Sequence, residues 1–159
     1  MDKHAPPFED FLMTVQPEYQ AFAAGIHESL LQGGYQCKIE SKANGFLVSY
    51  AHPKTKRSLL NFLFRKKGLV VRLYPDPSRM DALAAFLDTL PESMVTEIGK
   101  ASACKRLLNP SDCNSRCVMG YDISIRGTRY RKCRYSCFQF AATPESVPAL
   151  SEFVALCRA

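Results

Sequence analysis

Five cysteines lie between residues 104 and 140, and this group is the part of the sequence most able to do chemistry. Thiolates that converge from separate parts of a chain are good ligands for Zn²⁺, which binds four of them in a tetrahedron. Neighbouring cysteines are separated by eight, three, fifteen and three residues, a looser pattern than the CxxC pairs of a zinc ribbon. The pattern predicts a metal site but leaves the ligands open among Cys104, Cys113, Cys117, Cys133 and Cys137.

Strand geometry favours four of these five cysteines. The run that contains Cys133 and Cys137 is typical of a β-strand, on which they would lie about 13 Å apart at ~3.3 Å per residue. Sulfurs around one Zn²⁺ are roughly 3.8 Å apart, so both cannot bind the same ion unless the strand breaks. The alternative is a set of buried free thiols. We predict a structural zinc site of Cys104, Cys113, Cys117 and Cys133, with Cys137 as a packed thiol or substitute ligand.

Length and composition favour one domain. A chain of 159 residues with 47% hydrophobic residues can bury about 70% of its unfolded surface. The first residues lack the apolar segment of a signal peptide, and no apolar run approaches the ~18 residues of a membrane span, so we expect a cytoplasmic protein that contacts no membrane. An odd count of seven cysteines then favours reduced thiols or metal over disulfides.

The hydrophobic pattern predicts an α+β fold. Apolar residues recur with helical spacing over 8–15 and 17–33, and then alternate over four short segments between 35 and 73 that are joined by turns. These segments predict an antiparallel four-strand meander, covered on one face by helices, including two between 80 and 100. The domain is expected to span 1–159, with an α/β core over 1–100 and a Cys-rich hairpin and terminal helix over 101–159 packed on it.

Positive charge is concentrated in two regions. Residues 51–80 hold eight Lys and Arg against one Asp, a net charge of +7, and residues 101–140 hold eight against two Asp, a net charge of +6. Cations that alternate with Tyr130 and Tyr135 are typical of surfaces that neutralise phosphate and stack bases, although basic turns are also common as plain surface. The predicted nucleic-acid-binding residues are Lys54, Lys56, Arg57, Arg65, Lys66, Lys67, Arg126, Arg129, Arg131, Lys132 and Arg134.

The order of elements through about residue 100 is similar to that of the MmcQ/YjbR-like group of small α/β domains. DNA binding has been suggested for that group, and no reaction is defined for it. The final third resembles uncharacterised bacterial proteins with a cysteine-bearing C-terminal segment, and this resemblance implies no catalytic role. It is carried by Cys104-Lys105, Asp112-Cys113-Asn114, Cys117, Gly120-Tyr121, Gly127, Tyr130 and Lys132-Cys133-Arg134-Tyr135.

Three classes of function follow from these patterns. The first is a non-enzymatic binding module that is held by structural zinc and has nucleic acid as its candidate partner. The second is a thiol or metal enzyme, since cations beside Cys133 and Cys137 favour thiolate, although the sequence has no HExxH, P-loop or GxGxxG motif. The third is a small-molecule or anion-binding domain with a pocket between sheet and helices, in which Tyr74 and Tyr121 are candidate wall residues. The first is the prediction that we carry forward.

Overall fold

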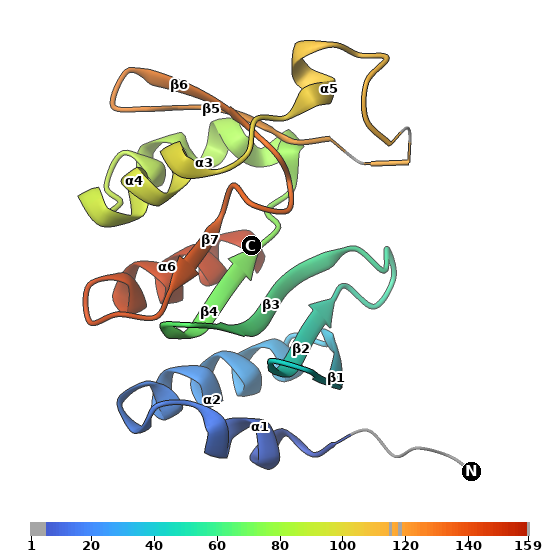
Figure 1. Ribbon diagram of the computed structural model, residues 1–159, viewed down its shortest axis with the longest axis vertical. Coiled ribbons are helices and arrows are strands. Elements are labelled where there is room, and N and C mark those ends of the chain that lie inside the picture. The colour runs from blue at the N-terminus through green and yellow to red at the C-terminus, as the bar shows by residue number, and fades with distance from the viewer. Residues whose placement is uncertain (1–5, 115, 118, 159) are drawn as a thin grey trace.

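A computed structural model describes residues 6–114, 116–117 and 119–158. Within them the chain forms six α-helices, one 3-10 turn and seven strands in two sheets (Figure 1), which confirms the predicted α+β class. The elements are α1 (Phe8–Thr14), α2 (Pro17–Gln32), β1 (Gln36–Lys42), β2 (Gly45–Ala51), β3 (Ser58–Arg65), β4 (Gly68–Leu73), η1 (Pro77–Arg79), α3 (Met80–Leu87), α4 (Glu92–Lys100), α5 (Lys105–Leu108), β5 (Tyr121–Ile125), β6 (Thr128–Lys132), β7 (Gln139–Ala141) and α6 (Ser146–Arg158).

The larger sheet contains the predicted meander. Strands β1 to β4 pair in sequence order and antiparallel, and β7 adds a fifth strand at the free edge of β4. Val48, Phe62 and Val71 occupy facing positions on three neighbouring strands, and all three are fully buried. The alternating apolar residues therefore fix the register, because a slip by one position would turn them to the opposite face.

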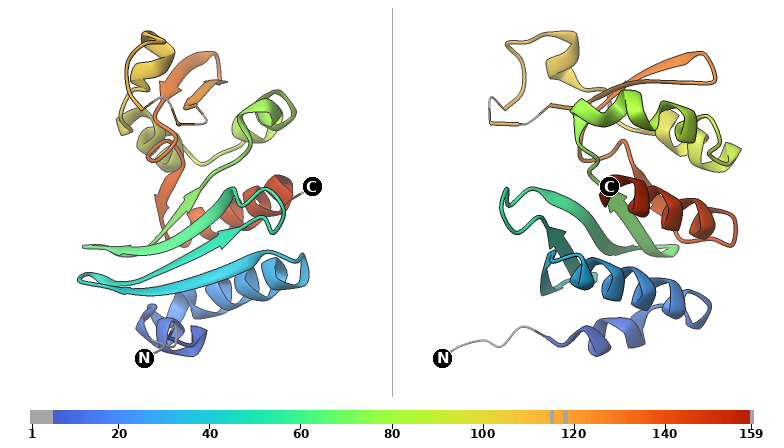
Figure 2. Two further views of the ribbon diagram at one scale, coloured as in Figure 1. Left: turned by 90° about the vertical axis from the view of Figure 1, so that its right-hand side faces the viewer. Right: turned by 180° about the vertical axis from the view of Figure 1, so that it is seen from behind.

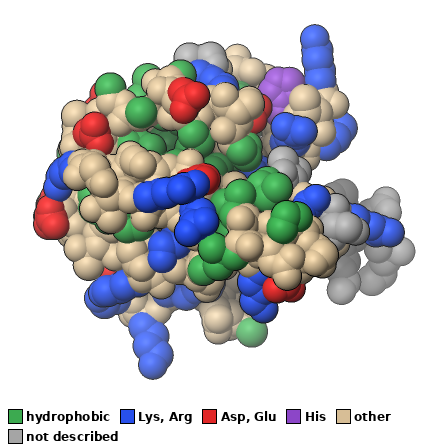
Figure 3. Space-filling model, turned by 90° about the horizontal axis from the view of Figure 1, so that it is seen from above, with side chains coloured by type: hydrophobic (Ala, Val, Ile, Leu, Met, Phe, Trp, Pro, Cys, Tyr) green, Lys and Arg blue, Asp and Glu red, His purple; other side chains and the backbone are tan. Residues whose placement is uncertain are grey.

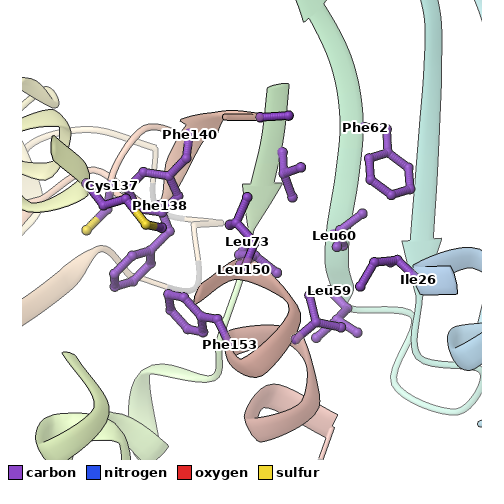
Figure 4. Close-up of a cluster of buried hydrophobic side chains, with 14 of the residues drawn as sticks. Ile26, Leu59, Leu60, Phe62, Leu73, Cys137, Phe138, Phe140, Leu150 and Phe153 are labelled. Carbon is purple, nitrogen blue, oxygen red and sulfur yellow. The ribbon is translucent and has the colours of Figure 1, made fainter. Parts of the chain in front are cut away.

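Helices α1, α2 and α6 pack their apolar stripes on one face of this sheet (Figure 2). The ring of Phe62 lies 5.5 Å from that of Phe11 in α1 and 6.4 Å from that of Phe22 in α2. Leu150 and Phe153 of α6 enter the same core from the side of β4 and β7 (Figure 4). The prediction that helices cover one face of the meander is confirmed.

Helices α3 and α4 have a different partner from the one that we expected. They pack against the β5–β6 hairpin, which forms a sheet of its own, and α4 also contacts β7. The hairpin turn is Arg126–Gly127, and both residues have positive φ, 50° and 84°, as a two-residue type I′ turn requires. Ile123 and Ile125 present alternate apolar side chains to these helices, so the amphipathic faces of α3 and α4 are buried there and not on the meander.

The second half of the Cys-rich segment also differs from the prediction of one strand through Phe140. Strand β6 ends at Lys132, and the backbone N–H of Cys137 donates to the Cys133 carbonyl at 2.9 Å, which closes a helical turn. After this turn the chain joins β4 as β7. The cause is packing, because Phe138 and Phe140 bury themselves in the main core, which a continuous hairpin strand would not reach.

Candidate metal centre

Cys104 and Cys133 are held side by side by backbone hydrogen bonds. The N–H of Cys104 donates to the Arg131 carbonyl at 3.1 Å, and the N–H of Cys133 donates to the Ser102 carbonyl at 2.7 Å, around an antiparallel bridge between Ala103 and Lys132. In such a pairing, Cys104 and Cys133 are diagonal neighbours on the same face, with Cβ atoms about 7 Å apart. One ion between them is compatible with that separation.

The loop after α5 folds back toward this pair. The N–H of Asp112 donates to the Asn109 carbonyl at 2.9 Å, which closes a turn over 109–112. A second turn follows, in which the N–H of Cys117 donates to the Asn114 carbonyl at 3.1 Å. The guanidinium of Arg106 donates to the carbonyl of Cys117 and ties the loop to α5. Cys113, which is exposed, and Cys117, which is partly buried, line one hollow together with Cys104 and Cys133.

Gly120 allows the loop to approach the pair closely. A Cβ at this position would lie 2.5 Å from the carbonyl oxygen of Lys132 and 2.6 Å from the sulfur of Cys104. Real Cβ atoms essentially never come so near, so any larger residue would force the backbone apart. Glycine is required here because the chain passes directly over Cys104 as it enters β5.

These segments enclose a cavity of about 340 Å³, which we call the cysteine cavity. Cys104, Cys113, Cys117 and Cys133 line it, and these are the four cysteines that the sequence predicted as ligands. In the described part of the chain, however, no three His, Cys, Asp or Glu side chains are placed to hold a metal ion. The structure thus gathers the four thiols around one cavity, and their convergence on a single ion remains a prediction.

The cavity wall is strongly basic. Lys105, Arg106, Arg116 and Arg134 line it together with the thiols, and among the described residues no Asp or Glu does. A centre of four thiolates and one Zn²⁺ carries a net charge of −2, which such a wall would balance.

The three other cysteines lie outside the cavity and pack against the hydrophobic core. Cys137 is 1% exposed and lies beside Phe138 (Figure 4). Burial raises its pKa far above the ordinary thiol value, and the nearby Cys133 raises it further against the opposing effect of Lys132. Burial likewise raises the pKa of Cys37, and that of Cys157 to about 12. The backbone turn after β6 meets our condition for Cys137 to share an ion with Cys133, but its side chain points into the core.

The structure distributes the predicted nucleic-acid-binding residues over several places. The two basic turns lie at opposite ends of β3, and Lys and Arg side chains are scattered across the face that carries the hairpin (Figure 3). Several hairpin cations have internal partners: Arg129 pairs with Asp122 at 2.7 Å, and the ammonium of Lys132 donates to the carbonyls of Gly99 and Ala101. Exposed residues with no ion pair among the described side chains are Lys54, Lys56, Arg65, Lys66, Lys67 and Arg131.

Sequence reasoning missed most of the basic cavity wall. Of its four cations only Arg134 was predicted as a site residue, and it was assigned to a nucleic-acid surface although it is 7% exposed. A signal was present, because Lys105, Arg116 and Arg134 each adjoin a cavity cysteine in the chain. In the sequence, a cysteine with an adjacent Lys or Arg is therefore the pattern that indicates the residues lining this cavity.

Comparison with models of protein families, with curated proteins and with solved structures gives no match for this chain. The resemblance to MmcQ/YjbR-like domains therefore stays a prediction. No helix in the described ranges has both the length and the hydrophobicity needed to cross a membrane. The candidate site must be judged on its own geometry.

Proposed function

We propose that this protein is a non-enzymatic binding module whose Cys-rich segment is held by one zinc ion, bound by Cys104, Cys113, Cys117 and Cys133. The observation that carries the proposal is the selection of thiols: four of the seven cysteines line one basic cavity and three lie outside it. Cys104 and Cys133 provide a fixed pair, and the turns of the loop bring the other two to the same cavity.

The ion in this proposal is structural. Four thiolates fill the tetrahedral positions of Zn²⁺, so no position stays open for an activated water. Because the thiols must come together to bind, the free energy of binding would contribute directly to the order of the loop. The basic wall would stabilise the charge of the centre, and Gly120 would allow the loop to pass over it.

Elemental analysis of protein purified without added metal tests the proposal. We expect about one zinc per chain in the natural protein, and loss of that zinc together with a lower melting temperature in Cys113→Ser. Cys113 is exposed, so the substitution disturbs no packing of its own. Cys37→Ser is the matched control, because Cys37 lies outside the cavity and should leave the zinc content unchanged. A natural protein that takes up no zinc, even after reduction and addition of Zn²⁺, would refute the proposal.

Nucleic acid is the candidate partner of the module. The observation in its favour is the set of exposed lysines and arginines that form no ion pair with a described carboxylate, three of them in the β3–β4 turn. Binding should weaken steeply with salt, since phosphate contacts release counterions. Lys66→Glu should reduce the affinity and flatten the salt dependence, whereas Lys38→Glu, an equal charge change on β1 outside the predicted set, should have less effect. Equal effects of the two substitutions, or binding that ignores salt, would count against this partner.

A further inference from the structure

A second hollow of about 270 Å³ lies at one end of the larger sheet, where β2 and β4 end and β3 begins. Its wall includes His52, Arg57, Tyr74, Asp76 and Arg134, and we call it the arginine pocket. Its volume is close to the lower end of the ~300–1,000 Å³ that small-molecule sites occupy. It is a separate hollow from the cysteine cavity, and Arg134 contributes to the walls of both.

Arg134 is a buried charge without a carboxylate partner among the described residues. It is 93% buried, given its exposed fraction of 7%, and it forms no ion pair with any carboxylate of the described residues. Its guanidinium lies over the ring of Tyr74 at 5.3 Å and donates from Nη1 to the hydroxyl of Tyr121 at 3.3 Å. A guanidinium has five N–H donors and stays charged, and burying such a group is costly unless an anion compensates it.

Other hydrogen-bond donors surround the same pocket. Arg57 reaches Asp76 only at 3.9 Å, the outer limit of an ion pair. Nδ1 of His52 accepts the backbone N–H groups of Lys54 and Thr55, at 3.2 and 3.3 Å, so the neutral ring carries its proton on Nε2 as a further donor.

The acceptor in the wall is already used. Asp76 accepts the backbone N–H and the hydroxyl of Ser78, at 3.0 and 2.9 Å. These hydrogen bonds lower the pKa of Asp76, with smaller contributions from Arg57 and Arg134, and so keep it ionised. The pocket therefore has more donors and positive charge than its own carboxylate can satisfy.

We propose that the arginine pocket binds a small phosphate monoester, with the phosphate between Arg134 and Arg57. Guanidinium groups match the geometry of phosphate oxygens with paired N–H donors, which is why arginine is favoured at such sites. The rings of Tyr35 and Tyr74 in the wall provide an apolar surface for the organic part of the ligand. The cavity thiols take no part in this site, and Arg134 is the residue that it shares with the wall of the cysteine cavity.

Titration calorimetry with phenyl phosphate tests the inference, with phenol as the uncharged comparison. We expect saturable binding of phenyl phosphate and none of phenol. Arg57→Gln should weaken binding about tenfold, because a charge-assisted contact to phosphate is lost. Asp76→Asn should tighten binding about threefold, since the amide oxygen still accepts from Ser78 while the negative charge is removed.

The controls separate this site from charge in general. Lys66→Glu changes the charge at the other end of β3 and should leave binding unchanged. Arg134→Lys keeps the charge but loses the paired donors, and should weaken binding about tenfold if it folds. Absence of saturable binding, equal weakening by Lys66→Glu and Arg57→Gln, or no tightening by Asp76→Asn would overturn the proposal.

Discussion

The larger sheet and the cysteine-rich loop are ordered by different physical means. On the sheet, Phe62 is fully buried among the rings of Phe11, Phe22 and Tyr50, and every strand contributes to one continuous core. Between 105 and 119, none of the described residues is buried, and Leu108 is 57% exposed. Turns, a four-residue helix and single hydrogen bonds give this loop its shape.

The difference shows where a bound ion would matter. Apolar burial stabilises the sheet with its helices, and a chain of this size can bury enough surface to fold without a metal. The loop buries almost no apolar surface, so it has little to offset the conformational entropy lost on ordering. A metal bound by its thiols would supply that free energy locally, while the sheet would keep its order without it.

The largest expected effect is on the sheet side. Phe62→Ala should lower the free energy of unfolding by about 3–5 kcal/mol, because it leaves a cavity among three aromatic rings. Urea denaturation measures this loss, and it should be the same with and without zinc. Met13→Ala is the control, since Met13 is 81% exposed and should change stability by less than about 0.5 kcal/mol. A loss below 1 kcal/mol at Phe62 would mean that the aromatic core is not what holds the sheet.

Alkaline pH provides a second test of the same core, through the thiols outside the cavity. Burial raises the folded-state pKa of Cys137 and Cys157, so both stay protonated in the folded chain while the unfolded chain ionises near pH 9. Their contribution to stability is complete below that value and is lost progressively as pH rises from it toward the folded-state pKa. We expect about 1.4 kcal/mol of loss per thiol by pH 10, to which Tyr50 and Tyr121, whose folded-state pKa burial also raises, add a smaller loss. Urea unfolding at pH 8, 9 and 10 measures this loss, and Cys157→Ala should reduce the slope of stability against pH.

The hydrophobic periodicity predicted the meander strands and their covering helices because each of these elements buries side chains at regular intervals. The alternation over Phe46, Val48 and Tyr50 and the Gly-containing turns predict the meander, and the helical stripe with Ile26 and Leu30 predicts its cover. What periodicity could not give is which surface each element meets. The apolar faces of α3 and α4 were equally suited to packing on the meander. In the structure the chain returns to the larger sheet only at β7, and the separate β5–β6 hairpin packs on α3 and α4.

The candidate site was predictable as a set of residues and not as a geometry. The spacing argument selected Cys104, Cys113, Cys117 and Cys133, and these four line the cavity. Its premise, a strand that continues past Cys133, was wrong, because long-range packing of Phe138 bends the chain there. Cys137 lies outside the cavity because its side chain packs in the hydrophobic core. Local spacing carries no information on such competition.

A glycine substitution tests whether close backbone approach holds the loop. Gly120→Ala should lower the free energy of unfolding by about 1–3 kcal/mol, because its Cβ would meet the fixed carbonyl of Lys132 and the sulfur of Cys104. The control is Gly25→Ala in α2, where a Cβ meets nothing within 4 Å. That change should stabilise the protein by about 0.5–1 kcal/mol, since alanine is the better helix former. If both variants were stabilised, the loop would not lie where we describe it.

The smallest of these effects is expected at the turn of the β5–β6 hairpin, where polar contacts tie the hairpin to the segment between α3 and α4. The backbone N–H of Arg126 donates to Asp88 at 2.8 Å, and its side chain donates to Glu92 and to the carbonyls of Asp88 and Leu90. Arg126→Ala should lower the free energy of unfolding by about 1–2 kcal/mol. The loss is modest for three side-chain hydrogen bonds because the Arg126 side chain is 44% exposed and solvent weakens its contacts. Arg126→Gly should cost less, since glycine adopts the positive φ of 50° without strain.

Arg131→Ala on the same hairpin is the matched control for these two variants. Arg131 is exposed, and in the described structure its side chain makes no hydrogen bond or ion pair. Its removal should change the free energy of unfolding by less than about 0.5 kcal/mol. Should Arg131→Ala and Arg126→Ala prove equally costly in urea denaturation, the hydrogen bonds of Arg126 to Asp88, Leu90 and Glu92 would contribute nothing specific to stability. The β5–β6 hairpin would then be held on the helices by the apolar contacts of Ile123 and Ile125.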